Sequence, residues 1–350
     1  MTNVVDSDIA EIGERLGEVA DAFAGKRMLL AGGGGFLGRY FRATISHLNR
    51  HRFSEPCELV VIDNLITAST AEVIDGDHCT FLQSDVAEPV DIDGPVDFVI
   101  NAAGIASPFY YRAYPLETLR AAVDGTRNLL ELAQAKGAKF TFFSSSEIYG
   151  DPDAKNIPTQ ESYRGNVACM GPRACYDESK RLGETLCFIY HGHHGLWTNT
   201  IRPFNVYGPG MQERDYRILP NFASNIKAGR TLKVYGSGKQ TRTYCYVTDA
   251  LNGFFRVIAK GVAGEAYNIG TSGPEIGVVD LIKRIETVLD DAIPRDHIDH
   301  PDSYPADEPN RRCPDIRKAR LQLGYKPQIE LDDGLDRYFT WADKHYTGAS

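Results

Sequence analysis

Tyr176 and Lys180 stand four residues apart in the segment YDESK, a spacing that places both side chains on one face of a helix. A lysine ammonium beside a tyrosine stabilises the phenolate, and a phenolate can accept a proton from a substrate hydroxyl. The pair alone is weak support for an active site, because many helices carry this spacing without any catalytic role. Its meaning depends on the other motifs of the chain.

A second polar segment, SSSEIYG, begins at Ser144 and follows a predicted buried strand. It places the carboxylate of Glu147 beside the hydroxyls of Ser145 and Ser146. Open α/β sheets keep their chemistry at strand ends, but a serine run also ends many strands without any further role. These residues alone leave both interpretations open.

The glycine-rich segment AGGGGFLG places Gly32, Gly35 and Gly38 between a predicted strand and a predicted helix. This spacing gives a tight turn, lets the backbone approach a pyrophosphate and directs a helix N-terminus at the anion. Asp63 closes the next strand, where a carboxylate can accept hydrogen bonds from both ribose hydroxyls. Because no arginine directly follows Asp63, a 2′-phosphate would meet an uncompensated charge. The segment therefore predicts NAD rather than NADP.

The full set of residues expected at the cofactor extends along the ends of the first four strands. Asp85 is the least certain of them, because a turn aspartate is as good an interpretation as an adenine contact. The set comprises Gly32, Gly35, Phe36, Leu37, Gly38, Asp63, Asn64, Asp85, Val86, Ala102 and Ala103, together with Tyr176 and Lys180.

Strands and helices that alternate from Lys26 onward must position these residues. The pattern predicts strands over 26–32, 57–63, 79–85, 96–104, 139–146 and 197–203, and helices over 36–48, 115–138 and 173–195. Near-continuous apolar strands between helices indicate a parallel sheet buried on both faces. We therefore expect the α/β class, a Rossmann-type doubly wound parallel sheet with a smaller C-terminal substrate-binding domain.

The expected domain boundaries follow the change of pattern after Pro203. The NAD-binding part should cover 26–203, and the mainly substrate-binding part 204–350, with segments near 242–270 interleaved with the first. The stretches 205–221 and 301–316 are expected to be loop-like and irregular. Residues 1–25 form an acidic extension with one apolar stripe on a helix, suited to packing on its own domain or, less well, to a dimer contact.

Composition bounds the function. The chain has 350 residues, 42% of them hydrophobic and 24% charged, values of an ordinary globular protein. A net charge of −9 argues against a nucleic-acid partner, and no apolar run or signal peptide points to a membrane. The seven cysteines are scattered and never form a CxxC pair, which favours reduced thiols and a cytoplasmic protein over disulfides or zinc. The HGHH segment fits a solvated helix end better than a metal site, so no metal is expected.

Long motifs of the chain resemble the extended short-chain dehydrogenase/reductase family and, within it, the UDP-glucuronate decarboxylases. SSSEIYGDP is similar to TSEVYGDP of that group, GPRACYDESKRLGET to GPRACYDEGKRxAET, YGSGKQTRTYCYVTD to YGxGxQTRSFCYVxD, and PADEPNRRCPDI to PxDDPxxRxPDI. The resemblance runs from about residue 26 to about residue 338 and departs from the pattern at Ala122, Ala168 and Gly210.

The resemblance implies a homodimer acting on a nucleotide sugar, most simply a UDP-sugar. Tyr176 and Lys180 would be the redox pair, Ser145 and Ser146 would contact the sugar, and Glu147 and Arg312 would serve the loss of the carboxylate. UDP-glucuronate would be oxidised at C4, lose carbon dioxide and be reduced to UDP-xylose. The expected substrate contacts are Ser107, Tyr111, Arg173, Asn205, Arg217, Tyr235, Arg242 and Arg312.

Two other classes of function stay open. One is a sister reaction on the same fold, a 4-epimerase or a 4,6-dehydratase, and the other is a non-catalytic NAD-sensing protein. A nucleotide-sugar 4-epimerase needs only oxidation and rotation of the sugar, so it has no use for Glu147. A 4,6-dehydratase typically has an aspartate where this chain has Ser146. A non-catalytic NAD-sensing protein would not need the tyrosine and lysine pair.

Overall fold

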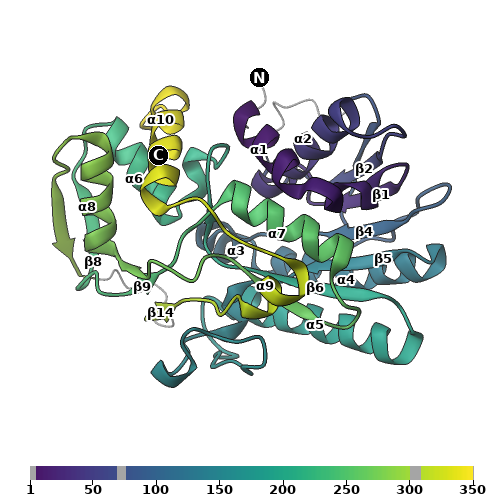
Figure 1. The fold of residues 1–350 in the computed structure, drawn as a ribbon. Coiled ribbons are helices and arrows are strands. Elements are labelled where there is room, and N and C mark those ends of the chain that lie inside the picture. The colour runs from purple at the N-terminus through teal and green to yellow at the C-terminus, as the bar shows by residue number, and fades with distance from the viewer. Residues whose placement is uncertain (1–4, 69–75, 300–308, 350) are drawn as a thin grey trace.

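The computed structural model describes residues 5–68, 76–299 and 309–349 (Figure 1). Within these residues, a parallel sheet of seven strands forms the centre of the molecule in the order β11-β6-β5-β4-β1-β2-β3. The strands are β1 (Arg27–Ala31), β2 (Glu58–Asp63), β3 (Cys79–Gln83), β4 (Phe98–Asn101), β5 (Lys139–Phe143), β6 (Thr198–Pro203) and β11 (Ala266–Ile269). This strand order confirms the predicted Rossmann-type sheet.

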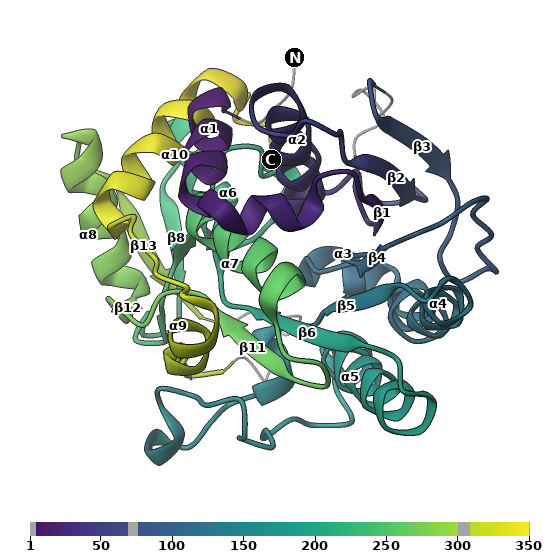
Figure 2. The same ribbon diagram turned by 45° about the vertical axis from the view of Figure 1, so that its right-hand side comes forward.

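Alternate residues of the strands enter two different cores. On β1, Met28 and Leu30 belong to the core on one face, and Leu29 and Ala31 to the core on the other. Helices α4 and α5 cover the second face, while α2, α7 and α1 cover the first (Figure 2). The bounds are α1 (Asp6–Leu16), α2 (Phe36–His51), α3 (Pro108–Ala113), α4 (Pro115–Lys136), α5 (Ala174–His194) and α7 (Val247–Lys260). Burial of both faces explains why these strands read as continuous apolar runs.

The strand β3 departs from the prediction of burial on both faces. Leu82 of β3 is 38% exposed, and the strand as a whole is only partly buried. The reason is its position, since among the described residues β3 is the last strand of the sheet and has β2 as its one neighbouring strand.

The N-terminal extension packs on its own chain but is not one continuous helix. α1 ends at Leu16, Gly17 adopts a left-handed conformation with φ of +52°, and a 3₁₀ helix follows over Gly17–Phe23. The apolar stripe is nevertheless buried, with Ile12 and Phe23 fully enclosed against α2 and α7. The change of helix type keeps the stripe facing the core past Gly17.

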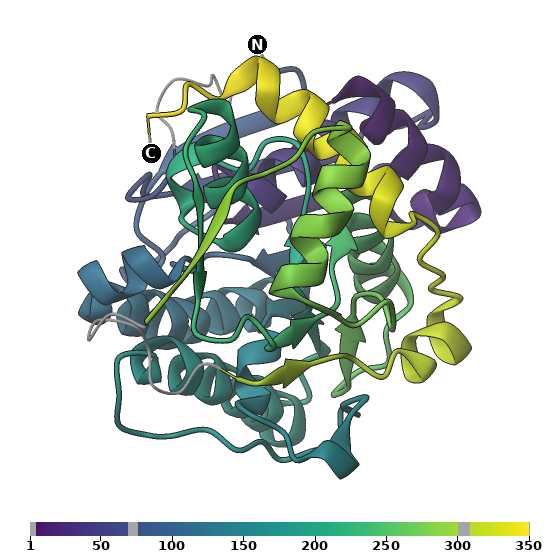
Figure 3. The same ribbon diagram turned by 90° about the vertical axis from the view of Figure 1, so that its left-hand side faces the viewer.

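The chain beyond Pro203 builds a smaller group of elements beside the carboxyl edge of the sheet (Figure 3). Two of them return to the large sheet, because β11 pairs with β6 and α7 packs beneath both. The others are β7 (Val206–Tyr207), α6 (Ile218–Lys227), β8 (Leu232–Tyr235), β9 (Thr241–Arg242), β10 (Cys245–Tyr246), β12 (Ile276–Gly277), α8 (Val278–Leu289), β13 (Arg295–Ile298), β14 (Arg311–Arg312), α9 (Arg317–Leu323) and α10 (Leu331–His345).

The prediction of a loop over 205–221 is wrong at its end, since α6 already begins at Ile218 with Pro220 in its first turn, where proline is tolerated. Of the stretch 301–316, residues 301–308 lie outside the described part, and Arg311–Arg312 forms the strand β14, which pairs with β9. Within the described ranges, no helix is both long enough and apolar enough to cross a bilayer.

Candidate active site

A cavity of about 1140 Å³ opens at the carboxyl edge of the sheet, where β1, β2, β3, β4 and β5 end. The elements that follow Pro203 form its opposite wall. Every residue predicted to serve the cofactor, the substrate or the chemistry lines it: Gly32, Gly35, Phe36, Leu37, Gly38, Asp63, Asn64, Asp85, Val86, Ala102, Ala103, Ser107, Tyr111, Ser145, Ser146, Glu147, Arg173, Tyr176, Lys180, Asn205, Arg217, Tyr235, Arg242 and Arg312.

The glycine-rich turn has the geometry of a pyrophosphate cradle. Gly32 has φ of +84°, and a Cβ there would lie 2.6 Å from the carbonyl oxygen of Ala102. A Cβ at Gly38 would lie 2.4 Å from the carbonyl oxygen of Gly32, so the helix packs directly on the turn. α2 begins immediately after Gly35, and its first turn carries no acidic residue. Backbone N–H groups and the helix N-terminus thus suit an anion.

The two aspartates expected at the adenosine are both held by the backbone. Asp63 accepts hydrogen bonds of 2.8 Å from the N–H groups of Gly34 and Leu65. Asp85 accepts from the N–H of Ala87 at 2.9 Å and from the side-chain amide of Asn64 at 3.2 Å. Asp85 therefore stabilises a turn, which was one of the two interpretations of this residue from the sequence. Its side chain also lines the cavity. A carboxylate oxygen has two acceptor positions, so both residues can accept further hydrogen bonds.

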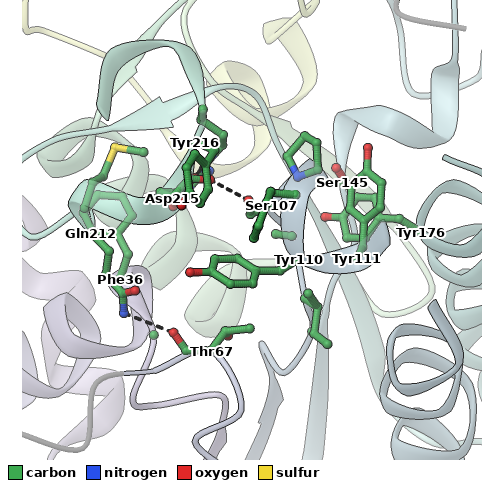
Figure 4. Close-up of a pocket in the computed structure, with 18 of the residues that line it drawn as sticks. Phe36, Thr67, Ser107, Tyr110, Tyr111, Ser145, Tyr176, Gln212, Asp215 and Tyr216 are labelled. Carbon is green, nitrogen blue, oxygen red and sulfur yellow. Dashed lines mark hydrogen bonds and ion pairs between the residues drawn. The ribbon is translucent and has the colours of Figure 1, made fainter. Parts of the chain in front are cut away.

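Tyr176 and Lys180 project from α5 into the same side of the cavity. The ring of Tyr176 stacks on that of Tyr111, with the ring centroids 5.3 Å apart, and Ser145 lies beside them (Figure 4). Burial raises the pKa of Tyr176 to about 12, against the lowering effect of a hydrogen bond with Ser145. The ammonium of Lys180 donates to the carbonyl oxygen of Phe143 at 2.8 Å, and burial lowers its pKa to about 8. A positive charge brought next to the phenol would favour the phenolate.

Glu147 lies in the 3₁₀ turn Ser146–Tyr149 that follows β5, between two arginines. Its Oε2 accepts from Nη2 of Arg173 on α5 and from Nη2 of Arg312 on β14, the latter at 2.6 Å. Burial disfavours the charged form, but the positive charges of Arg173, Arg312 and Arg242 outweigh it and hold the pKa of Glu147 below its usual value. Glu147 is thus an ionised carboxylate at the end of β5.

The remaining predicted substrate contacts also have partners within the protein. Ser107 donates to the carbonyl oxygen of Asp215 at 2.5 Å, and Arg217 forms a two-pronged ion pair with the Asp215 carboxylate at 2.5 and 2.7 Å. Asn205 donates to the carbonyl oxygen of Thr243 at 2.9 Å. These contacts fix the loops that carry the cavity wall.

Some cavity residues have no signal in the sequence. Gln212 donates to the carbonyl oxygen of Thr67 at 3.1 Å, across the cavity and 145 positions along the chain. Tyr110 and Tyr216 project between this contact and the catalytic side of the cavity (Figure 4). No local pattern marks pairs so distant in the chain. The described part of the chain places no group of three or more metal-ligating His, Cys, Asp or Glu side chains together.

A glycine-rich turn at the ends of a parallel sheet, with a tyrosine and a lysine of one helix lining the same cavity, is the arrangement of a dinucleotide-binding enzyme. The NAD dependent epimerase/dehydratase family matches residues 28–270, and the chain belongs to this family. The predicted enzyme class and the predicted cofactor NAD are thereby confirmed, as is the resemblance to extended short-chain dehydrogenases/reductases.

Relatives of known activity agree with the group indicated by the motifs. UDP-glucuronic acid decarboxylase 3 of Arabidopsis thaliana is 39% identical over 313 residues, which cover 88% of this chain and 86% of that protein. UDP-glucuronic acid decarboxylase 1 of Xenopus tropicalis is 37% identical over 315 residues, 89% of this chain and 71% of that protein.

Solved structures share the fold. DesIV, a dTDP-glucose 4,6-dehydratase of Streptomyces venezuelae solved with NAD bound, superposes with a TM-score of 0.78 at 26% identity, covering 91% of this chain and 97% of its own. The UDP-glucuronic acid 4-epimerase of Bacillus cereus, solved with UDP-glucuronic acid and NAD, gives a TM-score of 0.75 at 22% identity, covering 91% and 100%. Because the identity to the 4-epimerase is only 22%, this similarity shows a shared fold and supports no statement about function.

Proposed function

We propose that the protein is an NAD-dependent decarboxylase that converts UDP-glucuronate into UDP-xylose and carbon dioxide. The observation that carries the proposal is Glu147, held between Arg173 and Arg312 beside Tyr176. An arginine-rich site next to a proton acceptor suits a sugar that bears a carboxylate. The decarboxylases related to the chain at 37–39% identity support the same substrate.

The reaction begins with Tyr176 in its phenolate form, which the nearby Lys180 ammonium favours and which takes the proton of the C4 hydroxyl of the sugar. NAD, when bound, would supply the acceptor and the later donor of the C4 hydride, so the reaction would have no net oxidation. The C4 ketone is β to the C6 carboxylate, so the electrons of the breaking C5–C6 bond pass into an enolate and carbon dioxide leaves. A proton taken up from the solvent is then added at C5, and the C4 hydroxyl is restored as Tyr176 gives back the proton that it took in the first step.

The charged cluster binds and destabilises the carboxylate. Arg173, Arg242 and Arg312 provide positive charge where the sugar carboxylate must lie, and all three are buried. Ionised Glu147 places a negative charge beside that carboxylate, which favours its loss as neutral carbon dioxide. Ser145, hydrogen-bonded with Tyr176, positions the phenol toward the sugar.

The protein acts as a homodimer in this proposal. Helices α4 and α5 pack side by side and carry large apolar side chains on their outer surface. Those more than a third exposed are Leu116, Leu119, Leu182, Phe188 and Ile189. An isologous pairing of the two helices with those of a second copy would cover this surface. The proposed compartment is the cytoplasm, on the basis of the scattered cysteines.

Incubation of the purified protein with UDP-glucuronate, followed by mass spectrometry, tests the function. The expected product has lost the mass of carbon dioxide and is UDP-xylose, with no net change of NAD. A product of equal mass would assign a 4-epimerase, and loss of water a dehydratase. Binding of NAD without conversion of any nucleotide sugar would assign a sensor.

A further inference from the structure

Asp177 follows Tyr176 in the chain and lies behind the charged cluster. Asp177 is buried, with an exposed fraction of 5%, and it does not line the cavity. Oδ2 lies 3.5 Å from Nε of Arg173, one helical turn earlier on α5, and buried Oδ1 has no hydrogen-bond partner among the described residues. A buried, poorly paired carboxylate is costly when it is charged.

Arg173 connects this carboxylate to the active site. Its Nε faces Asp177, while its Nη2 donates to Glu147 in the cavity wall. Glu147 is also bound by Arg312, so it has two close guanidinium partners where Asp177 has one distant contact. Of the two carboxylates, Asp177 is therefore the one that takes up a proton first.

The electrostatics of the cluster agree with this order. Burial, and next the negative charge of Glu147, raise the pKa of Asp177 to about 7 against the opposing charges of Arg173 and Arg312. When Asp177 is ionised, Glu147 and Asp177 place two negative charges beside Arg173 and Arg312. When Asp177 is neutral, the cluster carries one more positive charge.

We propose, on the basis of the proposed function, that Asp177 is a positioning residue whose ionisation sets the charge around Arg173 and thereby the affinity of the site for the sugar carboxylate. The neutral form strengthens binding of that carboxylate, and the ionised form holds Arg173 on the helix and weakens it. Affinity for UDP-glucuronate should therefore fall as the pH rises through about 7.

The other groups around Asp177 do not change charge in this range or act on a different part of the ligand. Glu147 has a lowered pKa, and the pKa values of Tyr176 and Cys175 are raised. Lys180 has a pKa of about 8, but its ammonium contacts the carbonyl oxygen of Phe143 on the cofactor side. A ligand without the carboxylate separates its effect from that of Asp177.

The test measures calorimetric affinities of the NAD-loaded protein for UDP-glucuronate and for UDP-glucose at pH of about 6 and about 8. Tyr176→Phe serves as the parent protein, because it binds without turnover. The ratio of the two affinities should fall by about fivefold or more at the higher pH, the scale of a moderate coupling between sites. In the parent with added Asp177→Asn, the ratio should stay at its low-pH value.

Glu178→Gln is the matched control, since Glu178 is the neighbouring, partly exposed carboxylate and pairs with Arg181. It should keep the pH dependence of the parent. A ratio in the parent that does not change with pH, or an unchanged fall in the Asp177→Asn protein, would overturn the role of Asp177. The measurements on the Tyr176→Phe parent at the two pH values test the proposal even if the protein with the added Asp177→Asn change does not fold. Equal affinity for both ligands at both pH values would instead show that the protein does not recognise the sugar carboxylate, and this result would overturn the proposed substrate.

Discussion

At the scale of residues, Tyr176 and Glu147 have opposite electrostatic environments. The phenol is buried with a pKa raised to about 12, whereas three arginines lower the pKa of the carboxyl group. Two groups whose environments separate their pKa values suit two different steps of one reaction. In the proposed reaction, Tyr176 takes part in the transfer of the C4 proton, and Glu147 takes part in the loss of the carboxylate.

Replacement of Tyr176 by phenylalanine should stop the first step. The ring keeps its stack on Tyr111, so the thermal midpoint should stay near that of the native protein. Turnover of UDP-glucuronate should fall by about two orders of magnitude or more, with no reduced cofactor visible by absorbance. Near-normal turnover would contradict the role of Tyr176 as the base.

Replacement of Glu147 by glutamine should stop a later step. The change keeps the size of the side chain but removes the charge that balances Arg173 and Arg312. Decarboxylation should fall by about two orders of magnitude, while UDP-glucuronate still binds. Because Tyr176 is intact, reduced cofactor should accumulate on mixing, which separates this variant from Tyr176→Phe. Undiminished release of carbon dioxide would mean that Glu147 has no role in the reaction and serves only as a polar residue after the end of β5.

At the scale of elements, a strap formed by residues 212–217 closes one side of the cavity and is held from three directions. Gln212 bonds to Thr67, Asp215 to Ser107, and Glu213 to the C-terminal segment. The carboxylate of Glu213 accepts from the backbone N–H of Thr347 at 2.9 Å and from that of Ala349 at 3.0 Å. The C-terminus thereby fixes the wall of the active site.

The Glu213 contact predicts a pH-dependent stability. Partial burial disfavours the charge, but hydrogen bonds from Thr347 and Ser224 lower the pKa of Glu213 to about 2. A depressed pKa stabilises the folded state fully above the unfolded value of about 4.3 and loses this effect as the pH falls toward about 2. Because solvent screens the part-exposed carboxylate, Glu213→Gln should cost about 1 kcal/mol of unfolding free energy at neutral pH. Melting curves should differ at pH of about 7 and converge at about pH 2 to 3; a constant difference would contradict this account.

At the scale of the whole molecule, the proposed dimer surface is the outer side of α4 and α5. Phe188 is 70% exposed there. Phe188→Glu would place charges at a two-fold contact and should shift light scattering from a dimer to a monomer. Leu321→Glu, on α9 away from this surface and 86% exposed, is the matched control and should leave the mass unchanged. A monomer in the unaltered protein at every concentration would reject the dimer.

The sequence by itself determined the central sheet, the cofactor and many of the residues that line the cavity. Gly32, Gly38 and Asp63 could be predicted because their roles depend on local geometry, a turn followed by a helix and the end of a neighbouring strand. Tyr176 and Lys180 followed from the helical repeat. In a parallel sheet the carboxyl ends of the strands share one edge. The sequence alone therefore predicts that residues at those ends lie near one another.

Only the tertiary structure decided which side chains touch. Arg173 contacts both Asp177, on its own helix, and Glu147, which lies 26 positions away in the chain. Arg312 reaches the carboxylate of Glu147 from β14, 165 positions away. The contact of Gln212 with Thr67 is of the same kind. The position of Asp177 one turn after Arg173 was visible in the sequence, but its burial was not. Charge and protonation in a buried cluster depend on distances that no local pattern encodes.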